Sequence, residues 1–346
     1  STNTITGLLD AWQDNTPVIF ISGQIKRKET SRNSKTNLRQ FGVQEADIIS
    51  IVEPITKYAV MVNEPEKILY HLEKAVHLAL SGRPGPVWID IPLDVQGFSP
   101  DEKDLIHFIP EEKSINGICG MDKFFEMYQQ AKRPIILAGN GVRLSGAVED
   151  LREFSKSNNI PCVVSYLAVD YFEQDNLNYV GRLGIKGDRA GNFAIQNSDL
   201  IICLGSRLSV ALTGFEYELF GRESKLVVID IDKDEHEKNT VKIDHFIKAD
   251  VKEFLKIIAD KVQKKEQCEW QEKCIHWKNK WPVSQDNYDT DTVNMYEFTK
   301  ALSELANDNA IVVSDAGSSY YVTSQSLTFK SIKQRYITSG AQADMG

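Results

Sequence analysis

Short apolar runs alternate with amphipathic stretches along almost the whole chain. The runs at 17–21, 86–91, 134–138, 161–165, 200–204, 226–231, 310–314 and 335–337 predict buried β-strands. Between them, apolar positions recur at helical spacing. In residues 65–80, for example, Ile68, Leu72, Ala75 and Ala79 fall on one helix face. Continuous apolar strands that alternate with helices are typical of parallel sheets covered by helices on both faces, so the predicted fold class is α/β.

The helical stretches add one feature with two interpretations. Further helices are predicted at 5–12, 44–52, 121–132, from about 145, at 251–262, 268–281 and 294–305. The helix at 268–281 places Trp270, Trp277 and Trp281 on one face. This stripe could stack on a cofactor, but packing of a linker helix on a neighbouring element is the interpretation we favour.

Breaks in the pattern divide the chain into parts. Residues 98–120 are rich in Pro, Lys and Glu without periodicity, which predicts a linker. We therefore predict one domain at 1–97, a central domain at 121–265, a linker helix at 266–292 and a last part at 293–346. The chain opens on a helix start without Met and stops after a strand and a Gly-containing turn. We expect the chain to be a fragment, with its first and last domains incomplete.

Composition and charge exclude several classes of protein. The 346 residues are 42% hydrophobic and 26% charged, as in ordinary folded domains. A net charge of −9 argues against a nucleic-acid partner. The longest apolar runs are too short to span a bilayer and no signal peptide is evident, so no membrane partner is predicted. Five cysteines without a C-x-x-C pair indicate a reducing, cytoplasmic location with neither disulfides nor zinc.

One segment departs from the acidic balance. Residues 26–39 contain six basic side chains and only one acidic side chain. This basic loop could steer an anionic substrate, although a solvated loop is the more ordinary interpretation. The six histidines show no metal-ligand spacing, so no metal site is predicted.

Glycine-containing turns follow several of the central strands. In a parallel α/β sheet, ligands bind beyond the carboxyl ends of the strands, where glycine lets the backbone approach phosphate. The turn at Gly139–Gly141 and the turn at Gly205–Arg207 could bind a pyrophosphate. Asp230 or Asp232 could bind a ribose or an adenine edge. With Gly184 and Lys186 nearby in the sequence, these positions suggest an adenine-nucleotide site, although each turn alone is also an ordinary tight turn.

A long string and an ordered series of motifs carry a resemblance. Residues 82–95, Gly-Arg-Pro-Gly-Pro-Val-Trp-Ile-Asp-Ile-Pro-Leu-Asp-Val, resemble the segment that closes the pyrimidine-binding domain of thiamine-diphosphate enzymes of the acetolactate synthase type. Residues 1–3, 17–24 and 43–48 resemble the family's T-N, S-G-Q and F-Q-E-x-D-I motifs. Residues 138–141, 181–187, 205–207 and 228–232 are similar to its central domain, and residues 339–346 resemble the start of its diphosphate-binding core.

The resemblance implies a fold and an activity. It implies a complete Rossmann-like central domain between two partial thiamine-diphosphate-binding domains, in a homo-oligomer. The implied reaction is decarboxylation of a 2-keto acid and transfer of its acyl-carbanion equivalent to a carbonyl acceptor, with thiamine diphosphate and Mg²⁺. The glutamate that such enzymes need would precede Ser1, and their G-D-G…N motif would follow Gly346. We therefore expect the isolated chain to be inactive and to bind the cofactor poorly.

The resemblance also assigns residues. FAD is an open alternative in the central domain, because Arg207 is kept but the family's acidic pair and second arginine are not. Gln44 is assigned a supporting role in catalysis. The residues assigned to cofactor binding are Asn3, Gln24, Gly139, Gly141, Arg143, Gly184, Lys186, Gly205, Ser206, Arg207, Asp230, Asp232, Asp250, Gly317, Ser318, Gly340 and Met345.

Three functional hypotheses follow. The first is a thiamine-diphosphate-dependent carboligase or decarboxylase of which this chain is a part. The second is a non-catalytic module that binds FAD or ADP through the central domain. The third is a structural or interaction role for a remnant chain.

Overall fold

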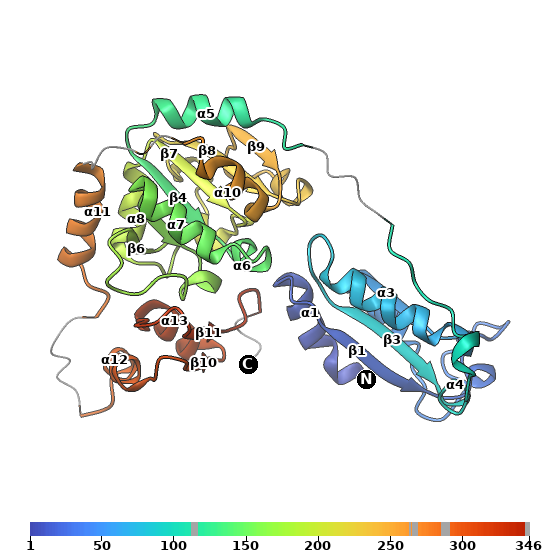
Figure 1. The fold of residues 1–346 in the computed structure, drawn as a ribbon. Helices are drawn as coiled ribbons and strands as arrows, with labels where there is room; N and C mark the ends of the chain where they lie inside the picture. The colour runs from blue at the N-terminus through green and yellow to red at the C-terminus, as the bar shows by residue number, and fades with distance from the viewer. Residues whose placement is uncertain (112–116, 263, 265–268, 285–290, 343–346) are drawn as a thin grey trace. The chain divides into compact units, whose positions relative to one another are not determined.

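The computed structural model describes residues 1–111, 117–262, 264, 269–284 and 291–342. They form two compact units, the first made of the described residues up to 111 and the second of the described residues from 117 onward (Figure 1). The division lies inside the segment 98–120, which the sequence predicts as a linker. The finer division of the chain into five parts stays a prediction.

The first unit is a three-stranded parallel sheet with helices on both faces. Its strands are β1 (Ile19–Gln24), β2 (Tyr58–Met61) and β3 (Val87–Pro92), in the order β1-β3-β2. Its helices are α1 (Ile5–Gln13), α2 (Ile48–Val52), α3 (Ile68–Leu80) and α4 (Leu93–Gln96). Trp88 packs with α1 and α2 on one face, whereas Val87 and Ile89 pack with α3 on the other. Successive side chains of β3 thus pack in two different hydrophobic cores, as expected for a strand buried on both faces.

The second unit contains a six-stranded parallel sheet in the order β6-β5-β4-β7-β8-β9. Its strands are β4 (Pro134–Ala138), β5 (Cys162–Val164), β6 (Tyr179–Arg182), β7 (Leu200–Leu204), β8 (Lys225–Asp230) and β9 (His245–Lys248). The helices up to the end of this sheet region are α5 (Met121–Gln130), α6 (Gly141–Leu144), α7 (Val148–Asn158), α8 (Arg189–Asn197), α9 (Val210–Thr213) and α10 (Val251–Ala259). The predicted α/β class with parallel sheets is confirmed.

Alternate residues of β4 separate the two cores of this sheet. Ile136 packs with residues of α5, α7 and α10, whereas Ile135 packs with residues of α8 and α9. Each fully buried aliphatic side chain of this kind contributes about 1.5–3 kcal/mol to stability. Cys162 and Cys203 are buried in β5 and β7, and burial raises the pKa of both thiols, so they pack as small apolar groups.

The remaining elements of the second unit follow the sheet in sequence. They are α11 (Glu269–Lys280), α12 (Met295–Leu305), β10 (Ile311–Val313), α13 (Gly317–Ser326) and β11 (Arg335–Ile337), with β10 and β11 paired in parallel. Trp270 is buried and its indole N–H donates to the Pro134 carbonyl at 3.0 Å. This contact is the packing role that we favoured for the tryptophan stripe.

The structure differs from the sequence expectations in a few elements. Strands β2, β6 and β9 were not predicted. The helix predicted at 44–52 begins only at Ile48, because Gln44 has a left-handed backbone (φ +58°) and Asp47 is non-helical. Helix α7 begins at Val148 rather than near 145, because Gly146 (φ +68°) interrupts the helix between α6 and α7.

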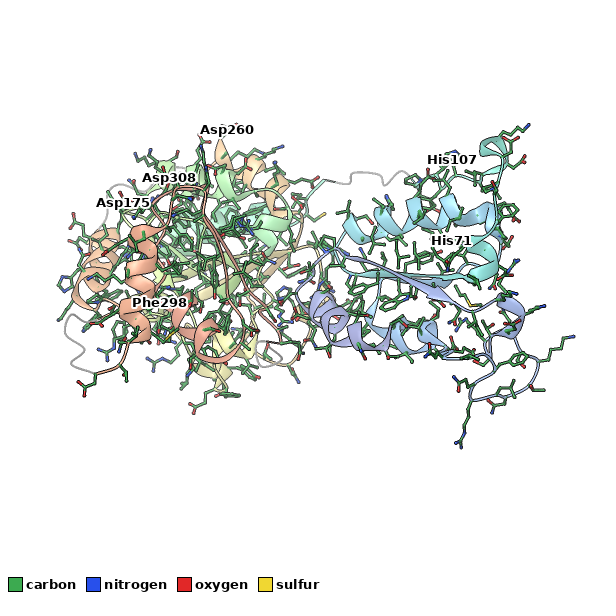
Figure 2. The ribbon with its side chains drawn as sticks, turned by 90° about the horizontal axis from the view of Figure 1, so that it is seen from below. His71, His107, Asp175, Asp260, Phe298 and Asp308 are labelled. Atoms are coloured by element: carbon green, nitrogen blue, oxygen red, sulfur yellow. The ribbon has the colours of Figure 1, made fainter. Side chains whose placement is uncertain are left out.

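Two further observations bear on function. None of the helices in the described part of the chain is long and apolar enough to cross a bilayer. His71 and His107, both labelled in Figure 2, each bind a neighbouring side chain. His71 Nδ1 lies 2.6 Å from the Tyr58 hydroxyl, and His107 Nδ1 lies 2.9 Å from Glu73 Oε1. These contacts give both histidines a structural role on the surface of the first unit.

Candidate functional site

The carboxyl ends of β4 and β7 form the main candidate site. From β4 the chain proceeds to β5 and β6 on one side, then crosses to β7, β8 and β9 on the other. The crevice between β4 and β7 is therefore a topological switch point, where ligands bind in open α/β sheets. The predicted turns at Gly139–Gly141 and Gly205–Arg207 follow these two strands. The fold thus brings together two turns that are 66 residues apart in the sequence.

The two glycine turns are in direct backbone contact. The Gly139 N–H donates to the Leu204 carbonyl at 2.9 Å, and the Gly141 N–H donates to the Gly205 carbonyl at 2.8 Å. A Cβ at Gly139 would lie 2.3 Å from the Gly205 carbonyl oxygen. A Cβ at Gly205, where φ is +55°, would lie 2.6 Å from the Gly141 Cα. Packing of one turn on the other is therefore enough to require glycine at all three positions.

Arg143 is occupied by contacts within the protein. Its guanidinium forms an ion pair with Asp170 and lies over the Tyr171 ring, 4.8 Å from the centroid. The Asp170 side chain is buried and also lies 3.1 Å from Arg335 Nε, while it accepts a 3.1 Å hydrogen bond from the Tyr336 N–H. Burial raises the pKa of this carboxyl, and Arg143 acts against that effect. Asp170 thus connects the turn after β4 to strand β11, a contact that no local sequence pattern predicts.

Arg207 differs from Arg143 in having its guanidinium available. Its backbone carbonyl accepts a hydrogen bond from Lys238 Nζ at 2.5 Å, but its side chain forms no ion pair or hydrogen bond within the described ranges. Ser206 beside it is buried. Arg207 is therefore the predicted switch-point side chain best placed to contact an anionic ligand.

The two predicted acidic positions after β8 are engaged in local structure. Asp230 Oδ2 lies 3.4 Å from His236 Nε2, and its Oδ1 accepts from the Asp232 N–H at 3.0 Å. Asp232 Oδ1 accepts from the backbone N–H groups of Asp234 and Glu235. These contacts explain the loop conformation without a ligand. A role for either carboxylate in ribose binding stays a prediction.

The other predicted residues of the second unit have structural partners. Asp250 caps α10, because its Oδ1 accepts from the Lys252 and Glu253 N–H groups. Gly184 has φ +121°, and a Cβ there would lie 2.4 Å from the Ala211 carbonyl oxygen. The Lys186 ammonium lies 5.2 Å from the centroid of the Tyr321 ring.

The last predicted positions lie near the end of the chain. Gly317, with φ +63°, and Ser318 are the first two residues of α13. Gly340 follows β11, and Met345 lies outside the described residues.

The first unit contains a buried polar cluster at the ends of β1 and β3. Ser22 donates to Asp90 Oδ1 at 2.6 Å, and the Trp88 indole N–H donates to Ser22 Oγ at 2.8 Å. Gln24 Nε2 donates to Asp90 Oδ2 at 3.1 Å and to the Ala46 carbonyl at 2.9 Å. Burial raises the pKa of the Asp90 carboxyl, and the hydrogen bonds from Ser22 and Gln24 oppose the shift. Both N–H groups of Gln24 are donated internally, and its side-chain oxygen accepts from the Ile25 N–H at 3.0 Å, so one lone pair of that oxygen is left for a ligand.

Glu45, rather than the predicted Gln44, organises the basic loop. The Gln44 side chain is exposed, whereas Glu45 is buried and accepts hydrogen bonds from Ser31, Phe41 and Gly42. Burial acts to raise the pKa of Glu45, but these hydrogen bonds outweigh it and lower the pKa. Asn3 is exposed in the turn before α1.

Two basic residues of the loop form ion pairs and others do not. Arg27 pairs with Asp94 at 2.8 Å, and Arg32 pairs with Asp47 at 2.9 Å. Lys28, Lys35 and Arg39 are exposed and form no ion pair with the described part of the chain. Most of the basic side chains of the loop are thus not neutralised by an acidic partner, and the exposed ones are consistent with the interpretation as a solvated loop.

Comparisons with known proteins agree with this architecture. Residues 121–258 match the model of the thiamine pyrophosphate enzyme central domain. The whole chain aligns with the probable acetolactate synthase large subunit of Methanocaldococcus jannaschii at 30% identity, covering 59% of that protein. It also aligns with acetolactate synthase isozyme 2 large subunit of Escherichia coli at 28% identity, covering 60% of it. A third relative is chloroplastic acetolactate synthase 1 of Nicotiana tabacum, at 29% identity over 51% of its length.

The chain matches only part of the length of these relatives. The chain spans less than two thirds of each of these relatives, so the comparisons do not extend to their whole length. The family-model match covers the six-stranded sheet and the switch-point turns, from α5 to α10. The chain is therefore similar to acetolactate synthase large subunits over its whole length, and its residues 121–258 match the central domain of thiamine pyrophosphate enzymes.

Proposed function

We propose that the whole protein is a thiamine-diphosphate-dependent carboligase or decarboxylase that acts on a 2-keto acid. The observation that carries the proposal is the similarity of the entire chain to acetolactate synthase large subunits. When bound, thiamine diphosphate supplies a carbanion that allows a 2-keto acid to lose CO₂ and transfer its acyl group.

This chain's own residues are proposed to build the walls of that site. In the first unit, Asp90 fixes the amide of Gln24, so that the Gln24 carbonyl oxygen has one orientation. No group of three or more His, Cys, Asp or Glu side chains among the described residues converges as metal ligands, so no Mg²⁺ ligand is assigned within them. We also propose that the isolated 346-residue chain has no turnover, and that the whole protein is a cytoplasmic homo-oligomer.

A test of the activity uses the full-length protein with thiamine diphosphate, Mg²⁺ and a panel of 2-keto acids that includes pyruvate. A hydroxy-keto acid product would identify a carboligase, and an aldehyde would identify a decarboxylase. The same assay on the 346-residue chain should show no product. The proposal would be refuted if the full-length protein consumed none of the 2-keto acids in the panel.

Nucleotide binding at the switch point is a second candidate function. The observation that favours it is the available guanidinium of Arg207 beside two glycine turns. We propose that Arg207 binds a phosphate of FAD or ADP, while the turns exclude side chains from the crevice. An Arg207→Met variant should then lose at least tenfold in FAD or ADP affinity without a change in unfolding free energy. Arg222→Met, at an exposed site, is the matched control. Equal affinities in wild type and Arg207→Met would exclude this role.

A further inference from the structure

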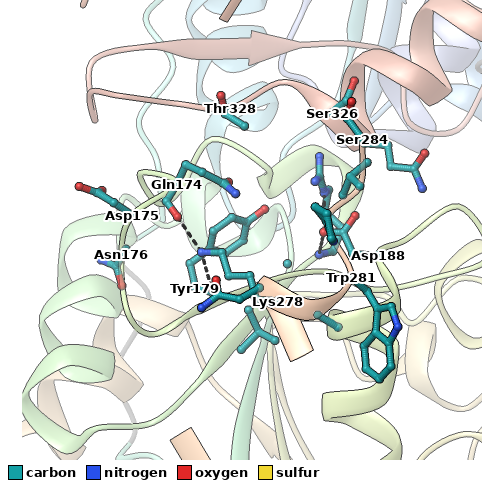
Figure 3. A pocket seen from close by; sticks show the side chains of 18 of the residues that line it. Gln174, Asp175, Asn176, Tyr179, Asp188, Lys278, Trp281, Ser284, Ser326 and Thr328 are labelled. Carbon is teal, nitrogen blue, oxygen red and sulfur yellow. Dashed lines mark hydrogen bonds and ion pairs between the residues drawn. The ribbon is translucent and has the colours of Figure 1, made fainter. Parts of the chain in front are cut away.

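A cavity of about 700 Å³ lies beside the edge strand β6 of the second unit. Its walls come from β6 and the residues before it, from the end of α11, and from α12 and α13 (Figure 3). It lies away from the β4–β7 switch point in the sheet order, because β5 separates β6 from β4. Its volume is in the range of sites that bind small molecules. Neither of the functions proposed above uses it.

One wall carries a buried carboxylate with an unused oxygen. Asp188 is 7% exposed, and its Oδ2 accepts from the Arg182 N–H at 2.9 Å and from Arg182 Nε at 3.1 Å. Its Oδ1 is buried and accepts no hydrogen bond from the described residues. Asp188 precedes α8 but does not cap it. Because a buried acceptor without a donor is costly, this oxygen favours a ligand that donates an O–H or N–H group.

A second wall carries a lysine without an acidic partner. Lys278 Nζ donates to the Gln174 carbonyl at 2.6 Å and to the Tyr179 carbonyl at 2.9 Å, as the dashed lines of Figure 3 show. The ammonium also lies 4.9 Å from the centroid of the Tyr179 ring. Of its three N–H donors, one remains without a hydrogen-bond acceptor. Lys278 forms no ion pair within the described ranges. Burial lowers its pKa to about 8, which is the effect expected of a cation removed from water without a counter-ion.

The charges around the cavity do not balance in its interior. The Arg182–Asp188 pair is neutral, so the Lys278 ammonium leaves the inner wall with one positive charge. The other charged lining residues, Asp175, Lys300 and Glu304, are exposed at the surface. They are screened by water and contribute little to the interior. The inner wall therefore favours an anion.

Apolar side chains complete the lining. Val180, Ala190, Ile275 and Trp281 also line the cavity. They would bury the hydrocarbon part of a ligand, at about 25 cal/mol for each Å² of apolar surface removed from water.

We propose that this cavity binds a small carboxylate that carries a hydroxyl or ammonium group beside the carboxylate and an apolar remainder. The carboxylate pairs with Lys278, the neighbouring O–H or N–H donates to Asp188 Oδ1, and the apolar part packs against Trp281 and Ile275. This inference is independent of thiamine diphosphate and of the proposed reaction.

Isothermal titration calorimetry on the full chain tests the site with four matched probes. These are 3-phenyllactate, phenylalanine, 3-phenylpropionate, which lacks the second donor, and 3-phenyl-1,2-propanediol, which lacks the carboxylate. We expect phenyllactate or phenylalanine to bind at least tenfold more tightly than the last two. Lys278→Met should weaken that binding at least tenfold. Lys273→Met, on the exposed face of the same helix α11, should leave it unchanged.

A second measurement covers the case in which Lys278→Met fails to fold. Pairing with a carboxylate raises the pKa of Lys278, so wild-type protein should take up protons when it binds phenyllactate at pH 8.5. Titrations in two buffers with different ionisation enthalpies report this uptake. No binding of any probe, or binding without proton uptake, would overturn the proposal. Equal affinity for phenyllactate and phenylpropionate would overturn the assignment of Asp188 as an acceptor.

Discussion

Alanine substitutions at the switch-point glycines separate two effects that the structure distinguishes. At Gly139 the backbone is ordinary, but a Cβ would lie 2.3 Å from the Gly205 carbonyl oxygen, so Gly139→Ala introduces a clash alone. At Gly146, φ is +68° and the nearest atom to a Cβ is the flexible Lys252 ammonium at 3.7 Å, so Gly146→Ala introduces backbone strain alone. At Gly205 both effects act, because φ is +55° and the Gly141 backbone lies within 2.6 Å.

The magnitudes follow from these differences. Left-handed backbone costs a non-glycine residue about 1 kcal/mol, and forcing atoms into a packed site costs about 1–3 kcal/mol. The clashes here are with backbone, which yields little, so the upper value applies. We expect losses in unfolding free energy of about 1 kcal/mol for Gly146→Ala, about 3 kcal/mol for Gly139→Ala and about 4 kcal/mol for Gly205→Ala.

Hydrogen exchange measured by mass spectrometry localises the effect. Since each 1.4 kcal/mol corresponds to a factor of ten, the peptides of β4 and β7 should lose about a hundredfold in protection in Gly139→Ala. Peptides of α3, in the first unit, are an internal control and should be unchanged. Protection in Gly139→Ala equal to that of wild type would refute the contact between the two turns.

Three further predictions concern single side chains. Asp250→Ala should lower the free energy of unfolding in urea by about 1 kcal/mol, because α10 loses its cap. Asp260→Ala, at the other end of α10, should lower it by less than about 0.5 kcal/mol. Equal losses in the two variants would contradict the capping role. Glu45→Gln should speed tryptic cleavage of the basic loop several-fold relative to Glu53→Gln, because the loop's hydrogen bonds to the carboxylate weaken; equal rates would argue that Glu45 does not hold the loop. Burial raises the pKa of Asp90 in the folded state, so protonation of this carboxyl favours folding. Its contribution to the free energy of unfolding is complete below the pKa of the unfolded carboxyl, and it declines as the pH rises through the pKa of the folded carboxyl. A ¹³C titration of the Asp90 carboxyl should give a midpoint above the ordinary aspartate value of 3.8, and a lower midpoint would contradict the effect of burial.

The strands that were missed lie at the edges of the sheets, although the edge strands β1, β10 and β11 were predicted. The central strands β4 and β7 are buried on both faces, so their apolar runs are uninterrupted and were predicted with the observed boundaries. The missed strands β2, β6 and β9 are all edge strands. β6 ends in Gly181 and Arg182, and β9 begins with His245 and ends in Lys248. Such short polar-ended segments carry no clear period, and only pairing with a neighbour makes them strands.

The candidate site was predictable in part for a related reason. Gly139, Gly141 and Gly205 were identified because ligands in this fold class bind after strands. That β4 and β7 are neighbours depends on strand order, which local periodicity does not encode. The partners of Arg143 and Arg182 were missed because such ion pairs form through tertiary packing. Asp170 reaches from its own loop to Arg335, 165 residues later in the sequence.

The most direct test of the central claim is release of ¹³CO₂ from 1-¹³C-labelled 2-keto acids by the full-length protein. The account predicts release that requires both thiamine diphosphate and Mg²⁺ for at least one 2-keto acid of the panel, starting with pyruvate. Release that is absent for every 2-keto acid, or that is unaffected by removing thiamine diphosphate, would contradict it.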